Sequence, residues 1–78
     1  MANRTHLRIL GHGVNVWNAW RKNRPTISPD LSGADLTYRK LNGANLSNAN
    51  LNRANFTHTD MMSVNLVGAS LDGATGLS

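Results

Sequence analysis

Large apolar residues recur every five positions between residues 31 and 71. The residues at this position are Leu31, Leu36, Leu41, Leu46, Leu51, Phe56, Met61, Leu66 and Leu71. In most copies a small residue lies two positions earlier, and Asp or Asn comes directly before the large residue. Neither the 3.6-residue period of a helix nor the two-residue period of a strand buries both apolar positions along the whole run. The pattern therefore predicts a short extended piece followed by a turn in every five residues, with Asn, Asp, Ser and Gly facing water.

The repeated motif resembles that of the pentapeptide-repeat family, whose pattern is A(D/N)LXX. It is carried by Ala34-Asp35-Leu36, Ala44-Asn45-Leu46, Ala49-Asn50-Leu51 and Ala54-Asn55-Phe56. The resemblance covers residues 29–78 and implies a mainly β fold, a right-handed quadrilateral β-helix with four pentapeptides in each coil. This solenoid would have about two and a half coils, and the nine large residues would point inward as its core. The alternative interpretation of the repeat is a disordered Asn-rich segment, because short polar repeats often bury too little apolar surface to fold.

The first 28 residues are expected to cap this repeat region. A single apolar stripe at helical spacing predicts one capping helix, formed around Leu7, Leu10, Val14, Trp17 and Trp20. Gly11 and Gly13 weaken that helix in isolation, so we expect packing on the first coil to hold it. A lid of this kind is expected because the bare edge of a terminal repeat invites pairing with other chains. We therefore divide the chain into residues 1–28, a capping helix and linker, and residues 29–78, the repeat.

The segment before the repeat carries a second resemblance. Residues 17–22, Trp-Asn-Ala-Trp-Arg-Lys, together with residues 29–31, Pro-Asp-Leu, look like the lead-in of pentapeptide regions in larger bacterial signalling proteins. The chain could thus serve as the N-terminal module of a larger protein.

The net charge of +4 is concentrated at one end, because residues 1–24 contain five cations and no acid. Such a segment could contact nucleic acid or an anionic membrane. We prefer a structural interpretation, since Arg21, Lys22 and Arg24 lie where cations complement the end of a helix. With no cysteine, no leader-like segment and no apolar run long enough for a bilayer, the sequence predicts a cytoplasmic protein that does not cross a membrane.

No arrangement of residues predicts catalysis. Nucleophilic and metal-assisted reactions need an activated Ser or Cys, or a cluster of His, Cys and carboxylates, and neither pattern is visible. The repeat glycines at 33, 43, 68 and 73 stand two positions after a large apolar residue, where they favour turns over a phosphate-binding loop. We expect a non-enzyme without a cofactor or metal.

One face of the repeat is irregular. Arg39 occupies a position for a small residue, and an unpaired arginine is costly to bury, so we expect a local backbone distortion there. Four pentapeptides per coil would also stack Tyr38 over His58. This face is a candidate contact surface, although loss of the repeat pattern at positions that tolerate substitution explains these residues equally well.

These observations favour a structural or protein-interaction scaffold. Apolar residues take the outward position only late in the chain, at Met62, Val67 and Leu77. If the chain stops at residue 78, an apolar rim and an unpaired backbone edge coincide, and we expect a homo-oligomer joined through this end. An alternative is the DNA mimicry by which some family members modulate gyrase or topoisomerase, but this near-neutral repeat lacks the acidic surface it needs. Direct nucleic-acid binding through the basic helix is a further alternative that we disfavour.

Overall fold

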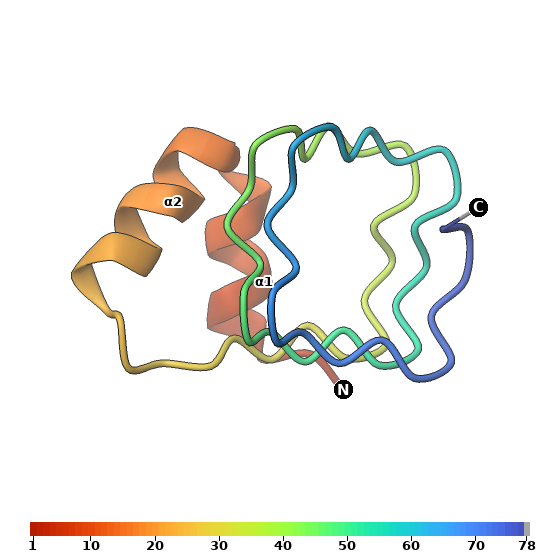
Figure 1. The fold of residues 1–78 in the computed structure, drawn as a ribbon, viewed down its shortest axis with the longest axis horizontal. Coiled ribbons are helices and arrows are strands. Elements are labelled where there is room, and N and C mark those ends of the chain that lie inside the picture. The colour runs from red at the N-terminus through yellow and green to blue at the C-terminus, as the bar shows by residue number, and fades with distance from the viewer. Residues whose placement is uncertain (78) are drawn as a thin grey trace.

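A computed structural model of the chain describes residues 1–77, in which two helices precede a stack of coils (Figure 1). Helix α1 spans Arg4–Gly11 and helix α2 spans Val14–Asn23. The helices lie together at one end of the molecule, and the C-terminal end of the chain lies at the other.

The prediction of a single capping helix is wrong, because the apolar stripe is divided between α1 and α2. Asn3 caps α1, its Oδ1 accepting the N–H groups of Thr5 and His6 at 2.8 and 3.1 Å. Gly13 has a φ of 108°, a backbone conformation that residues with a side chain rarely adopt. The break at Gly13 ends one helix and lets the next start in a new direction.

The coil stack, residues 29–77, is held together by pairing between residues 20 positions apart. Six isolated parallel bridges link Asp30 to Asn50, Asp35 to Asn55, Lys40 to Asp60, Asn45 to Asn65, Asn50 to Ser70 and Asn55 to Thr75. At the first of these, the Leu31 N–H donates to the Asn50 carbonyl and the Asn50 N–H donates to the Pro29 carbonyl, both at 2.8 Å. A step of 20 residues places four pentapeptides in each coil.

The expected mainly β class is nevertheless wrong. No residue between 1 and 77 belongs to an extended β-strand, and the only regular elements there are the two helices. A turn closes after each large apolar residue, as where the Ala34 N–H donates to the Leu31 carbonyl at 3.1 Å. Only one residue in five is left to bridge to the next coil, so consecutive paired residues never accumulate into a strand.

Each turn places its third residue at a positive φ. Glycine fills this position at residues 33, 43, 68 and 73, but five other residues adopt φ values of 58–61°: Tyr38, Asn48, Arg53, His58 and Ser63. Asp or Asn supports many turns from the bridging position. The Oδ1 of Asp35, for example, accepts the Thr37 N–H at 3.0 Å and the Thr37 hydroxyl at 2.6 Å.

The core is densest next to the helices. Leu31, Leu36, Leu41, Leu46, Leu51 and Phe56 are buried together with Leu10 of α1 and Trp17 of α2. Leu7, Val14 and Trp20 are half-buried against this cluster. Met61, Leu66 and Leu71 point inward as well but are only half-buried, because no further coil covers them within residues 1–77.

Candidate interaction surfaces

Side chains of α2 close one side of the first coil by hydrogen bonding to its backbone. The Asn18 amide accepts the Asn45 N–H at 2.8 Å and donates to the Gly43 carbonyl at 3.0 Å. The Trp17 indole N–H donates to the Asn45 carbonyl at 2.7 Å. These side chains occupy the place that the backbone of a preceding coil would take.

Arg21 completes the same cover. Its two terminal nitrogens donate to the carbonyls of Asn45 and Ser47, each at 2.8 Å. The residue is only 6% exposed, and burial lowers the pKa of its guanidinium. Its Nε is buried without a hydrogen-bond partner in residues 1–77. Arg21 lies in the last turn of α2, as expected from sequence, and its guanidinium also holds that helix to the first coil.

A second side of the first coil is covered from the start of the chain. The Asn3 N–H donates to the Asp30 carbonyl at 2.9 Å, and the Asp30 N–H donates to Nδ1 of His6 at 3.0 Å. The His6 ring also packs on Trp20, with centroids 5.0 Å apart. His6 thus contributes to the cap.

The opposite end of the stack presents an open edge. In the described part of the chain no acceptor is found for six outward-directed backbone N–H groups, those of Met61, Ser63, Leu66, Gly68, Leu71 and Gly73. Their counterparts one coil earlier all donate to the next coil, as Leu46 does to Asn65 at 2.9 Å. We call this set of residues the open edge.

Apolar side chains surround the open edge. Met62 and Val67 are each 75% exposed and Leu77 is 44% exposed. A cavity of about 290 Å³ opens here, lined by Thr59, Met61, Val64, Leu66, Gly76 and Leu77. The structure therefore combines unpaired backbone groups with accessible apolar surface at this end.

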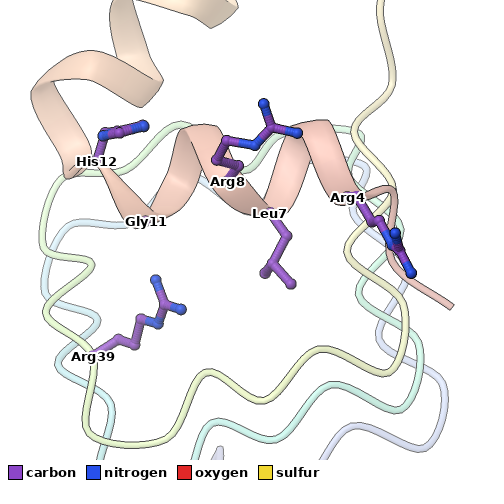
Figure 2. Close-up of a pocket in the computed structure, with 6 residues that line it drawn as sticks. All are labelled: Arg4, Leu7, Arg8, Gly11, His12 and Arg39. Carbon is purple, nitrogen blue, oxygen red and sulfur yellow. The ribbon is translucent and has the colours of Figure 1, made fainter.

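Arg39 does not distort the coil, contrary to the expectation from sequence. The bridge between Lys40 and Asp60 forms, and the Asp60 N–H donates to the Arg39 carbonyl at 2.9 Å. The side chain leaves the coil and rises toward α1, so no unpaired charge enters the core (Figure 2). Tyr38 and His58 stack beside it, with ring centroids 4.9 Å apart and planes inclined by 29°.

Arg39 faces a solvent-open cavity of about 470 Å³ beneath α1, lined otherwise by Arg4, Leu7, Arg8, Gly11 and His12. Leu7 points from the helix into the same space (Figure 2). Sequence reasoning missed this grouping, because nothing in the spacing of the residues signals that Arg39 meets α1. Within residues 1–77 no three His, Cys, Asp or Glu side chains gather as a metal site, and no helix is long and apolar enough to span a bilayer.

Comparison with known proteins agrees with the repeat seen in the sequence. The family model described as "Pentapeptide repeats (8 copies)" matches residues 30–66 and 40–75. Comparisons with curated proteins and with solved structures gave no match. The family match confirms the resemblance and supports the general role of a repeat scaffold or interaction module.

Proposed function

We propose, since this chain belongs to the pentapeptide-repeat family, that it is a non-catalytic interaction scaffold that associates with itself through the open edge. The observation that carries the proposal is the difference between the two ends of the stack. Helical side chains bond to the first coil at Asp30 and Asn45, whereas the last coil offers N–H groups without a partner in residues 1–77 beside exposed Met62 and Val67. An unprotected edge with an apolar rim is the combination that recruits another chain.

A two-fold, end-to-end dimer suits this asymmetry best. Head-to-tail stacking would bring the open edge of one copy against the helices of another. There the side chains of Trp17, Asn18 and Arg21 already donate to first-coil carbonyls, which are then not free to accept from a second copy. An isologous contact brings two open edges together and closes after two copies. In such a dimer, Met62 and Leu77 of each copy would lose exposure to water.

Charge weighs against the two alternative functions. The repeat carries Arg39, Lys40 and Arg53 against four aspartates, so it lacks the strongly acidic surface that DNA mimicry requires. Of the cations expected on a basic helix face, Arg21 is engaged with the first coil. We therefore favour protein association over gyrase modulation and over direct nucleic-acid binding.

Light scattering of the intact protein at micromolar to high micromolar concentration tests the proposal. We expect a dimer in the wild type and a monomer in a Met62→Lys, Leu77→Lys double variant, because two buried charges per copy oppose the contact. Val16→Lys is the matched control, since Val16 is 49% exposed on α2, away from the open edge. A wild type that remains monomeric at the highest concentration, or a double variant that dimerises as well as the control, would contradict self-association through this end.

A further inference from the structure

The first coil is covered on only part of its edge. The backbone groups of Asp30 and Asn45 are paired with the cap, as described above. Between these two points, no partner is found anywhere in residues 1–77 for the N–H groups of Asp35 and Lys40. The same holds for five carbonyls that repeat the acceptor positions of the later coils, that of Ser32 and, further along, those of Asp35, Thr37, Lys40 and Asn42. We call this stretch, residues 35–42, the uncovered side.

A groove lies beneath α1 and meets the uncovered side at Asp35 and Arg39. The cavity at Arg39 adjoins a second one of about 340 Å³, because Arg4 and Leu7 line both. The second cavity is bounded on the coil by residues 32–35 and at its end by residues 1–2. In Figure 2 the space between α1 and the coil is bordered by Leu7 from above and Arg39 from below.

The groove is positively charged. Arg4, Arg8 and Arg39 line it, and the charge of Arg39 is among the causes that lower the pKa of Asp35. Asp35 is the only acid among its lining residues. Three guanidinium groups against one carboxylate favour a ligand with negative charge.

We propose that the uncovered side binds an extended acidic peptide, whose backbone pairs with residues 35–42 while its carboxylates face the arginines. Addition of a strand to an exposed edge is a common mode of peptide recognition. The chain itself makes one backbone hydrogen bond to this edge, where the Asn3 N–H donates to the Asp30 carbonyl at 2.9 Å. Nucleic acid fits less well, because the carbonyls of the uncovered side need donors and a phosphodiester backbone has none.

Fluorescence anisotropy with a labelled octapeptide of alternating Glu and Val tests the proposal on the intact protein. We expect saturable binding that weakens about tenfold in Arg39→Gln, the loss of roughly one charged hydrogen bond. Arg53→Gln is the matched control, because Arg53 is exposed on the second coil and lines neither cavity. Asp35→Asn should tighten binding, since it removes the only carboxylate of the groove.

Two further probes separate this mode from charge attraction alone. The same peptide with alternate backbone amides methylated keeps its carboxylates but cannot donate to the edge, so it should bind at least tenfold more weakly. A single-stranded DNA oligonucleotide should also bind more weakly than the parent peptide. The proposal would be overturned if the parent peptide did not bind, or if the methylated peptide bound equally well. It would also be overturned if DNA bound more tightly than the peptide, or if Arg39→Gln and Arg53→Gln lost the same affinity. Amide shifts in NMR spectra report the location, because peptide should perturb Asp35 and Lys40, whereas dimerisation should perturb Leu66 and Leu71.

Discussion

At the scale of single residues, Arg21 is notable as a charged side chain that is buried. Its guanidinium donates to two backbone carbonyls at the capped end of the coil stack, one of which also accepts the Trp17 indole N–H. Burial opposes the charge, while hydrogen bonds of a cation to carbonyls favour it, and these bonds are the stronger kind. Arg21 therefore couples α2 to the repeat.

Replacing Arg21 should expose this coupling. We expect Arg21→Met, which keeps the length and apolar stem, to lower the free energy of unfolding by about 2 kcal/mol, because the Ser47 carbonyl loses its donor and the Asn45 carbonyl keeps only that of Trp17. Urea denaturation of the purified variant measures the change. Lys22→Met is the control, since Lys22 is exposed on the same helix. Equal effects of the two substitutions would show that the hydrogen bonds of the Arg21 guanidinium contribute nothing to stability.

Asp30 and Asp35 give the fold a dependence on pH. Hydrogen bonds from the hydroxyl and N–H of Ser32 lower the pKa of Asp30, and those of Thr37 lower the pKa of Asp35, below the ordinary value of 3.8. A depressed folded-state pKa stabilises the fold above the unfolded-state pKa. That stabilisation is lost as the pH falls through the lower folded-state pKa.

We therefore expect the urea midpoint to fall between about pH 5 and about pH 2, and to fall less in an Asp30→Asn, Asp35→Asn double variant. Asparagine preserves the turn, because Asn55 accepts the Thr57 N–H at 3.0 Å and its hydroxyl at 2.6 Å in the equivalent position. Asp72→Asn serves as the control, since no side-chain hydrogen bond to its carboxylate is found in residues 1–77. An unchanged acid profile in the double variant would contradict the role of these two turns.

At the scale of elements, the five-residue turn is the building unit, and its third position carries a conformational cost. Ser63 and Gly43 occupy this position in successive coils, with φ values of 59° and 77°. A Cβ on Gly43 would meet no atom within 4 Å, so exchange of the two residue types probes backbone conformation alone. A residue with a side chain is strained there, whereas glycine is not.

Ser63→Gly should accordingly stabilise the protein by about 0.5 kcal/mol. This is the backbone strain that glycine relieves in the folded state, minus the cost of the greater chain entropy that glycine has in the unfolded state. Gly43→Ser should destabilise it by a similar or larger amount. Thermal unfolding followed by circular dichroism compares both variants with the wild type. A stabilising Gly43→Ser would show that the positive φ imposes no cost in these turns.

The sequence predicted the elements whose signals are local and repeated. The interval of five located the turns and the inward position, because a turn and its apolar anchor lie within one pentapeptide. It overestimated the strand content, since one bridging residue per pentapeptide, such as Asn45, cannot build a ladder. It also missed the division of the helix at Gly13, where an apolar stripe continues across a backbone break.

Of the two candidate surfaces, one could be predicted from the sequence and the other could not. The apolar residues beside the open edge, such as Met62 and Val67, could be found because their outward position follows from the repeat register. The groove could not, because Arg39 and α1 meet only through tertiary packing. The cap contacts of Asn18 and Arg21 escaped notice for the same reason, since polar helix residues ordinarily indicate a solvated face.

At the scale of the whole molecule, burial declines from the capped end to the open edge. Leu46 and Leu66 illustrate the decline, because they belong to stacked pentapeptides joined by the bridge between Asn45 and Asn65. Leu46 is fully buried between the cap and the second coil, whereas Leu66 is half-buried beside the cavity of the open edge. The same substitution at these two positions therefore measures how strongly each coil is supported.

We expect Leu46→Ala to lower the free energy of unfolding by about 3 kcal/mol and Leu66→Ala by about 1 kcal/mol at low protein concentration. Leu46 loses buried contacts on all sides and leaves a cavity, while the Leu66 site already contacts water and leaves little new void. If two open edges meet in a dimer, Leu66 becomes buried, so the effect of Leu66→Ala should grow with protein concentration while that of Leu46→Ala stays constant. Urea denaturation at low and high micromolar concentration separates these cases. Equal effects of the two substitutions at low concentration would contradict the decline in burial, and a concentration-independent Leu66→Ala effect would contradict the burial of this edge by a second copy.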